Sequence, residues 1–365
     1  MPEKWITELK ADPMEWLLGS DNPPVRYFAL KDLLDYHDDD SEVVEAKASI
    51  SGWEKVTKLF SKQRAEGHWE SPDRPYSPKY KASYWQLMLL GMQGLDKEDE
   101  RVQRAVNHIF GFQHEEGGFT ELGLKGAREE YARRRVESDR GAAADLKAWT
   151  EERVRASQMS CLTGNVVLSL IRLGYCDDNR VGKALDWLVE IQNPDGGWLC
   201  PYWEAHLKDT HGCFMGTITP LHALAEYPEA RRKSDMLKTI RNGAEFLLMH
   251  RLFKADNHGF KVINQSWLEL RFPQFFYDIL RGLLVVTKLG YGADTRIDDA
   301  LMKLLQKQND EGKWTLDRSL TGRLQTGLDM KGRPSKWVTL DALRVIKRVV
   351  QQRGHLGVRT LASQR

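Results

Sequence analysis

The sequence predicts an all-α fold, an α/α toroid in which about six pairs of outer and inner helices surround a central cavity. Three observations predict it. A short turn signature recurs about every fifty residues, an amphipathic helical pattern precedes each copy, and a more apolar helical pattern follows it. Repeats of this kind stack one helix pair on the next, so that neighbouring pairs share a core.

The turn signature places a Gln six residues before an aromatic residue. Its copies are "KQRAEGHW" (62–69), "FQHEEGGF" (112–119), "IQNPDGGW" (191–198) and "KQNDEGKW" (307–314), and "HRLFKADNHGF" (250–260) is a degenerate copy. Glycine permits the positive φ of a helix C-terminal turn. We expect the Gln amide to bond backbone groups at a neighbouring helix end, with the aromatic ring covering that bond. The signature therefore predicts a structural staple between repeats.

The helices on either side of the turns differ in polarity. Apolar residues precede the second copy at the i, i+3, i+4, i+7 spacing of one helical stripe, at Val102, Ala105, Val106 and Ile109. The segments "SCLTGNVVLSLIRLGY" and "YDILRGLLVVTKLGY", which follow turns, are apolar nearly all round. This difference predicts an outer helix, a glycine turn and then a buried inner helix.

Both ends of the chain favour a closed ring. "DPMEWLL" and "PVRYFALKDLLDY" supply a further helix pair, and the last helical pattern, "WVTLDALRVIKRVV", is of the inner type. An open solenoid would end in polar capping repeats. We therefore expect one domain over 1–352, in which helices within 1–50 close the ring, and a disordered tail over 353–365.

One segment departs from the repeat. Residues 120–158 lengthen one repeat and are dense in Glu, Arg and Ala, which favours helix. We interpret the segment as an inserted charged helical hairpin that gates the cavity or docks a protein partner, because long insertions in compact domains are often functional.

Composition excludes several functional classes. With 54 Lys and Arg against 52 Asp and Glu, the net charge is +2, which provides no global field for nucleic acid or an anionic membrane. No run reaches the ~20 apolar residues of a transmembrane helix, and the start of the chain lacks the apolar core of a signal peptide. We therefore expect a cytoplasmic protein, with its four cysteines as thiols that are either core residues or ligands.

The repeats resemble those of the terpene cyclase and protein prenyltransferase superfamily, the squalene-cyclase-like Gln-Trp repeat toroids. The resemblance covers roughly residues 50–350 and implies an isoprenoid-type enzyme, prenyltransferase-like or terpene-cyclase-like, which binds an apolar small molecule in its cavity. The Asp-x-Asp-Asp motif of class II cyclases is missing, since the acidic run "DYHDDD" has a different spacing. A toroid that binds a lipid-like ligand or a protein without catalysis remains the alternative.

Resemblance to the prenyltransferase β subunits also suggests zinc. In those proteins Asp-x-Cys and a later His hold the metal, and the matching positions here are His211 and Cys213, followed by Tyr277 and Asp278. The motif "GRPSK" places Arg333 and Lys336 as diphosphate ligands, and the spacing of Lys208 matches a family lysine. The alternative is that the cysteines pack in the core and that the basic residues are merely solvated.

Aromatic and small residues concentrate where the inner helices are predicted to begin. If the ring closes, they converge on one end of the cavity and form an apolar pocket, the usual form of a small-molecule site. The pocket residues we predict are Tyr84, Trp85, Cys161, Tyr202, Phe276, Tyr277 and Trp337. Asp278, among aromatic neighbours, is our candidate catalytic acid with a raised pKa, and the alternative is a salt bridge to Arg281.

Overall fold

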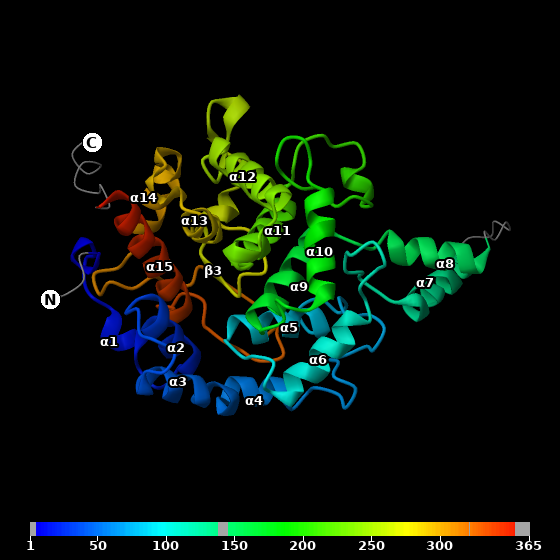
Figure 1. The fold of residues 1–365 in the computed structure, drawn as a ribbon, viewed down its shortest axis with the longest axis horizontal. Coiled ribbons are helices and arrows are strands. Elements are labelled where there is room, and N and C mark those ends of the chain that lie inside the picture. The colour runs from blue at the N-terminus through cyan, green and yellow to red at the C-terminus, as the bar shows by residue number, and fades with distance from the viewer. Residues whose placement is uncertain (1–4, 138–144, 321, 355–365) are drawn as a thin grey trace. The chain divides into compact units, whose positions relative to one another are not determined.

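Helices make up most of the regular structure in the computed structural model, which describes residues 5–137, 145–320 and 322–354 (Figure 1). The chain forms two units from interleaved segments. Unit 1 comprises the described parts of Met1–Thr57, Ala244–Gly322 and Thr326–Arg365, and unit 2 comprises those of Lys58–Gly243 and Arg323–Gln325. The single domain predicted over 1–352 stays a prediction, and each unit is described by itself below.

Unit 2 alternates outer and inner helices along the chain. Its inner helices are α5 (Ser83–Met92), α9 (Ser160–Arg172) and α11 (Phe214–Glu226), and α9 packs on both of the others. The outer helices are α6 (Glu100–Phe110) and α10 (Asn179–Glu190), while α4 (Glu54–Phe60) and α12 (Ser234–Met249) contribute residues to both units. This is the outer and inner order that the sequence predicts.

Burial separates the two kinds of helix as expected. Every residue of α5 from Ser83 to Gly91 is buried. In contrast, α6 buries only the stripe from Val102 to Phe110 that the spacing indicated and leaves its other face to solvent. The predicted fold class is therefore confirmed: the protein is all-α, and outer and inner helices are paired as in an α/α toroid.

Unit 1 contains the first pair and the last two inner helices. Its helices are α1 (Met14–Leu17), α2 (Pro23–Asp32), α3 (Ser41–Gly52), α13 (Ile279–Lys288), α14 (Asp298–Gln306) and α15 (Lys336–Arg353). Short strands pair as β1 (Lys254–Ala255) with β2 (Lys261–Val262) and β3 (Arg271–Phe272) with β4 (Arg318–Ser319), the first antiparallel and the second parallel. Helix α15 packs on both α13 and α2, and the backbone N–H of Lys10 donates to Gln308 Oε1 at 3.2 Å. The first and last repeats therefore meet within this unit.

The turn signature is a staple, as predicted, and its bonds are specific. The Gln192 amide donates to the carbonyl of Gly196 at 2.8 Å and to that of Thr239, in the next outer helix, at 2.9 Å. The Trp198 indole adds a bond that the sequence did not predict, to the Leu188 carbonyl of the preceding outer helix at 2.7 Å. Gln63 and Gln113, and the indoles of Trp69 and Trp314, repeat these two bonding patterns.

Glycine in these turns is required for two reasons. Gly117 has a φ of 118° and Gly196 a φ of 88°, in the left-handed region. A Cβ on Gly117 would also lie 2.7 Å from the Lys183 carbonyl oxygen of the next outer helix. A Cβ on Gly196 or Gly312 would overlap the backbone of Asn242 or Ala11 in the same way. Close approach of consecutive repeats therefore depends on these glycines.

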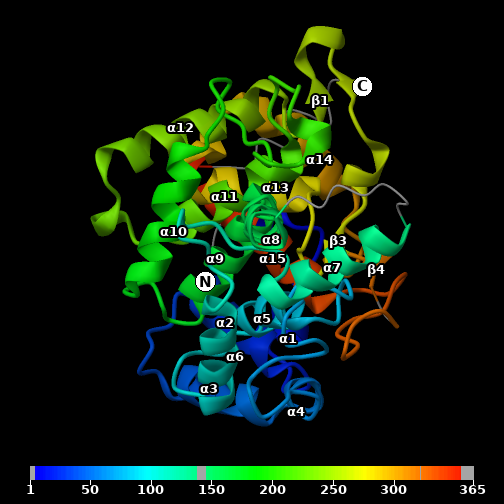
Figure 2. The same cartoon turned by 90° about the vertical axis from the view of Figure 1, so that its right-hand side faces the viewer.

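The range 120–158 contains α7 (Leu124–Glu137) and α8 (Leu146–Arg155), which pack side by side (Figure 2). Charged side chains hold the two helices to each other and to the rest of unit 2. The Glu130 carboxylate of α7 accepts from Arg153 Nε of α8 at 2.7 Å and from Arg74 Nη1, outside the pair, at 3.3 Å. Residues 138–144, between the two helices, lie outside the described residues. Of the tail predicted over 353–365, Arg353 is instead the last residue of α15 and donates to the Asp294 carbonyl at 3.0 Å, and residues from 355 onward lie outside the described part of the chain. Within the described ranges, no helix has the length and apolar character of a membrane span.

Candidate functional site

The starts of two inner helices in unit 2 bring thiols together. Cys161 lies in the first turn of α9, Cys213 is the N-cap residue of α11, and Cys200 follows the Trp198 turn. The Cys161 and Cys200 sulfurs are 3.8 Å apart, and the backbone N–H of Cys213 donates to the Trp198 carbonyl at 2.9 Å. The staple thus fixes this group of thiols, which we call the thiol cluster: Cys161, Cys200 and Cys213.

The two neighbouring thiols differ in acidity. Hydrogen bonding from Cys161, together with that from His206 and Ser160, lowers the pKa of Cys200 although the residue is buried. The same bond to Cys200, together with burial, raises the pKa of Cys161. Ser160 Oγ lies 3.5 Å from the Cys200 sulfur, and His206 Nδ1 accepts the Cys200 backbone N–H at 3.0 Å. Of the two thiols, Cys200 is therefore the more acidic.

Glu121 lies beside the thiol cluster with an unusual carboxyl group. Burial raises its pKa, and the charges of Glu130 and Cys200 raise it further, against the opposing charge of Arg153. The Arg153 guanidinium is 3.8 Å from the Glu121 carboxylate, and 30% of the Glu121 side chain remains exposed. A carboxyl group that is partly accessible and holds its proton above the usual range has the properties of a general acid.

Aromatic side chains border the same region. The Trp85 ring lies 5.2 Å from that of Tyr76 and 5.0 Å from that of Tyr80, and its indole donates to the Tyr76 carbonyl at 2.8 Å. Burial raises the pKa of Tyr76, and the charges of Cys161 and Glu121 add to the effect. The Tyr76 hydroxyl therefore stays protonated and is able to donate a hydrogen bond.

The other predicted pocket residues of unit 2 serve the scaffold. Tyr84 is fully buried, and its hydroxyl donates to the Thr120 carbonyl at 2.9 Å. The Tyr202 hydroxyl donates to Glu116 at 2.9 Å, and the Arg155 guanidinium stacks 4.6 Å above the Tyr202 ring. Within unit 2, Tyr84 thus lies close to Glu121, whose charge adds to the burial that raises the pKa of Tyr84. Cys161 contacts Cys200, Trp85 packs on Tyr76 and Tyr80, and Tyr202 makes scaffold contacts.

Three predicted pocket residues belong to unit 1. The Tyr277 hydroxyl donates to the Leu252 carbonyl, and Trp337 stacks on Phe272 with ring centroids 4.5 Å apart and planes at 8°. Phe276 is half-buried just before α13. Their assignment to one pocket with the unit 2 residues stays a prediction.

Asp278 caps the helix that it precedes. Its Oδ1 accepts the Arg281 backbone N–H at 2.8 Å, and its Oδ2 accepts that of Arg271 at 3.1 Å, with Arg271 Nε at 3.7 Å. Burial raises the pKa of Asp278 to about 6, although these donors oppose the shift. The residue is 1% exposed. The raised pKa that we predicted is present, but both oxygens already have partners and hardly any carboxyl surface is accessible.

The predicted zinc ligands are not assembled. His211 Nδ1 lies 3.0 Å from Asp195, Cys213 belongs to the thiol cluster, and Asp278 caps α13 in unit 1. Across the part of the chain that the structure describes, no three His, Cys, Asp or Glu side chains are grouped to hold a metal ion. The predicted set does not fit zinc within the described residues, and zinc itself stays a prediction.

The predicted diphosphate ligands have separate surroundings. Lys208 and Arg333 are exposed. Lys336 is nearly buried, where it pairs with Asp21 and lies 5.5 Å above the Trp16 ring. That ion pair gives Lys336 a role in joining the first and last repeats, and phosphate binding by the three residues stays a prediction.

Sequence reasoning missed Glu121 and gave Cys200 only a minor part. Their positions carried a usable signal, because each stands two residues after the aromatic of a turn signature, Phe119 or Trp198. The hydrogen bonds from Phe119 to Thr163 and from Trp198 to Thr217 hold this part of each turn against the start of the next inner helix. The second residue after the aromatic is thus a place to look for functional side chains in this repeat.

Several solved structures resemble this chain. A variant of the type II terpene cyclase MstE from Scytonema in complex with merosterolic acid A, its product, is 15% identical over 91% of this chain and 87% of that chain, with a TM-score of 0.45. A second MstE variant in complex with the substrate geranylgeranyl dihydroxybenzoate is 16% identical over 91% of this chain and 88% of that chain, with a TM-score of 0.44. A protein from Actinoplanes is 16% identical over 90% of each chain, with a TM-score of 0.45.

Each of these similarities is of low sequence identity, and fold similarity by itself does not assign a function. No protein-family model matches the sequence, and no curated protein matches it.

Proposed function

We propose that this chain is an isoprenoid-type enzyme, which binds an apolar substrate beside the inner-helix starts of unit 2 and uses Glu121 as its acid. The observation that carries the proposal is the state of Glu121: a partly exposed carboxyl group with a raised pKa, coupled to the Cys200 charge. The Glu121 charge interacts with Cys200 and with Tyr76, and an acid beside an aromatic ring is the combination of groups that an apolar substrate and a proton transfer require.

Accessibility favours Glu121 over Asp278. Both carboxyl groups have raised pKa values because of burial. Asp278 is 1% exposed and each of its oxygens already accepts a backbone N–H, whereas 30% of the Glu121 side chain is exposed. A proton donor must come within about 3 Å of the atom that it protonates. Glu121 meets this requirement without the loss of a helix cap.

The proposed step is protonation of an alkene. The O–H proton of Glu121 moves to an alkene carbon, whose π electrons form the new C–H bond, and a carbocation and the Glu121 carboxylate remain. The Tyr76 ring supplies negative quadrupole charge to stabilise that cation, whereas the Tyr80 and Trp85 rings already have the Lys79 ammonium 5.5 and 5.8 Å from their centroids. A neighbouring C–H proton then passes to water, which discharges the cation and forms a new double bond in the product, and a proton from solvent restores the Glu121 carboxyl group.

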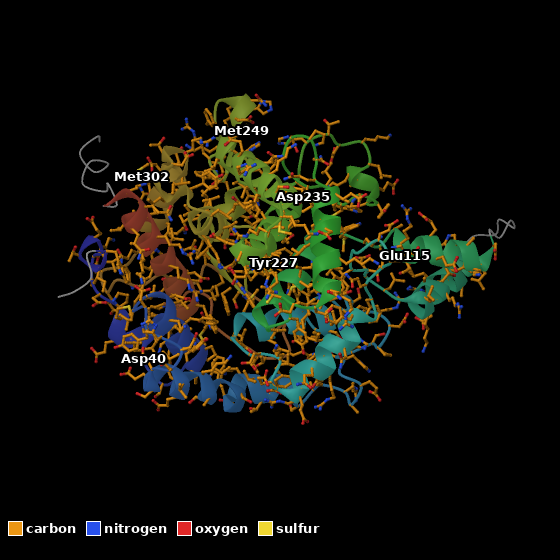
Figure 3. The ribbon with its side chains drawn as sticks, viewed as in Figure 1. Asp40, Glu115, Tyr227, Asp235, Met249 and Met302 are labelled. Carbon is orange, nitrogen blue, oxygen red and sulfur yellow. The ribbon has the colours of Figure 1, made fainter. Side chains whose placement is uncertain are left out.

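The test is turnover of apolar alkenes by the full chain. Probes are geranylgeraniol, geranylgeranyl diphosphate and geranylgeranyl dihydroxybenzoate, and products are identified by liquid chromatography and mass spectrometry in deuterated water. We expect a product that carries one deuterium from solvent, which Glu121→Gln abolishes. The matched control is Glu115→Gln, an exposed glutamate in the adjacent turn that is labelled in Figure 3, which keeps activity.

Three outcomes would count against the proposal. Equal turnover by Glu121→Gln and wild type would remove Glu121 as the acid. Loss of turnover with Asp278→Asn alone, in a variant of unchanged stability, would assign the acid to Asp278. Binding of the probes without any product would favour the alternative of a non-catalytic toroid that holds a lipid-like ligand.

A further inference from the structure

The thiol cluster contains a pair of sulfurs that packing alone does not explain. Cys161 and Cys200 come from segments 39 residues apart, and their sulfurs lie 3.8 Å from each other. Free cysteines that serve only as small apolar residues have no need of a second thiol in contact. Cys213 is the third thiol of the cluster, and Cys176 is half-buried elsewhere in unit 2, where its sulfur is 3.8 Å from Asp177.

We propose that Cys161 and Cys200 form a reversible redox pair, which peroxide converts into a disulfide. This inference stands independently of the proposed enzyme activity, since it concerns only the two thiols and their immediate neighbours. The sulfurs must approach from 3.8 Å to the roughly 2.05 Å of a disulfide bond. Cys200 lies in a loop outside the helices, so its backbone is able to make that adjustment.

The surroundings of Cys200 and Cys161 give the two residues different roles, nucleophile and resolving thiol. Ser160 Oγ lies 3.5 Å from the Cys200 sulfur, where its hydroxyl is able to donate to the thiolate, the nucleophilic form of a thiol. The His206 ring holds the Cys200 backbone, since its Nδ1 accepts the Cys200 N–H. Cys161 is the more exposed of the two and leaves a small oxidant a route to the pair. In redox-sensing sites, a low-pKa thiolate next to a resolving thiol has this arrangement.

The reaction balances with one molecule of hydrogen peroxide. The Cys200 thiolate attacks one peroxide oxygen, the O–O bond breaks, hydroxide leaves, and Cys200 becomes a sulfenic acid. The Cys161 sulfur then attacks the Cys200 sulfur, the S–S bond forms, and the sulfenic oxygen leaves as water. Overall, two thiols lose their hydrogens and are oxidised, and hydrogen peroxide is reduced to water.

The test is peptide mapping of the full chain after peroxide treatment. The reduced protein is exposed to a stoichiometric series of hydrogen peroxide, quenched with N-ethylmaleimide and digested without reductant. We expect a peptide that links Cys161 to Cys200, with Cys176 and Cys213 alkylated, and we expect dithiothreitol to restore four alkylated thiols. Cys176→Ser is the control variant, and the same link should form in it.

Two further variants separate redox chemistry from packing. Cys161→Ser should remove the link and leave a sulfenic acid on Cys200 that dimedone traps, whereas Cys200→Ser should remove the link and leave no dimedone adduct on Cys161. Alkylation of both Cys161 and Cys200 at every peroxide concentration would overturn the inference. A link from either residue to Cys213, or irreversible oxidation of Cys200 in the wild-type chain, would also overturn it.

Discussion

Equivalent positions at the inner-helix starts have different surroundings in the two units. In unit 1, Asp278 caps α13 and Lys336 at the start of α15 pairs with Asp21, so both charged groups are used by the scaffold. In unit 2, Cys161 at the start of α9 contacts another functional group, Cys200, and Glu121 is electrostatically coupled to it. The staple beneath them is the same, because Trp198 in unit 2 and Trp314 in unit 1 make matching bonds.

This difference shows that the repeat fixes where a side chain is presented and not what it does. A charged residue at an inner-helix start becomes structural where a backbone amide or a counter-ion lies within reach. It remains chemically active where its neighbours are other titratable groups. The predictions below test this comparison from the largest expected effect to the smallest.

Replacement of a turn glycine should have the largest effect, and it should be equal in the two units. Gly196→Ala and Gly312→Ala each place a Cβ on the backbone of the next repeat at positive φ, so we expect a loss of about 3 kcal/mol or more in unfolding free energy. Urea unfolding followed by circular dichroism measures it. Gly182→Ala is the control, since its Cβ meets open space within α10 and should gain up to about 1 kcal/mol. A mild effect at one turn glycine and a severe one at the other would break the premise of a shared scaffold.

Neutralisation of Glu121 in unit 2 should reduce activity, whereas neutralisation of Asp278 in unit 1 should not. Glu121→Gln should reduce turnover of the alkene probes by about 100-fold or more, which corresponds to roughly 2.7 kcal/mol of transition-state stabilisation. Asp278→Asn should keep turnover within about threefold of wild type, because the Asn side-chain oxygen still caps α13 and only the bond from the Arg271 N–H is lost. Rates measured at equal probe concentration provide the comparison, and reversed results would transfer the site to unit 1.

The pH dependence of the unfolding free energy should reveal the raised pKa of Asp278, the buried N-cap of α13. The pKa of Asp278 is raised from 3.8 to about 6, so its protonated form contributes stability that is complete below pH 3.8 and lost as the pH rises through 6. Asp278→Asn cannot ionise, so its stability relative to wild type should rise by on the order of 2 kcal/mol between pH 4 and pH 7. Asp278→Ala should lose about 1 kcal/mol through the missing cap. A difference between Asp278→Asn and wild type that does not change with pH would show that folding does not raise the pKa of Asp278.

The smallest effect should come from removal of a predicted zinc ligand. Because His211 is directed at Asp195, we expect Cys213→Ser and wild type to have the same zinc content in elemental mass spectrometry of protein without a His tag. One zinc per chain that disappears in Cys213→Ser would instead show that the thiol cluster binds metal. In that event the prenyltransferase interpretation of the site would gain over acid chemistry.

Much of the scaffold could be predicted because its information is local. A Gln six residues before an aromatic determines a turn whose own carbonyl the Gln bonds, as Gln192 does with Gly196. The apolar stripe in α6 and the uniformly apolar α5 follow in the same way from spacing within one helix. Only the glycine turn and the helical period are needed, and both are visible in short stretches of sequence.

The site could be predicted only in part, because its contacts join distant segments. We identified Cys161 and Trp85 from the aromatic-rich helix starts, but Glu121 gave no motif, and its raised pKa arises from burial and from the charges of Glu130 and Cys200. Asp278 was found by its aromatic neighbours, yet its two backbone donors make it a cap. Residue type alone does not distinguish these cases.

By itself, the sequence determined the all-α class, the order of outer and inner helices and the staple at each turn, since these depend on interactions within a few residues. Tertiary structure decided which candidates are structural and which are coupled. Lys336 is paired with Asp21 across 315 residues, and Cys161 meets Cys200 across 39. The physical reason is that burial and neighbouring charge set the reactivity of a titratable group, and both are properties of the folded chain.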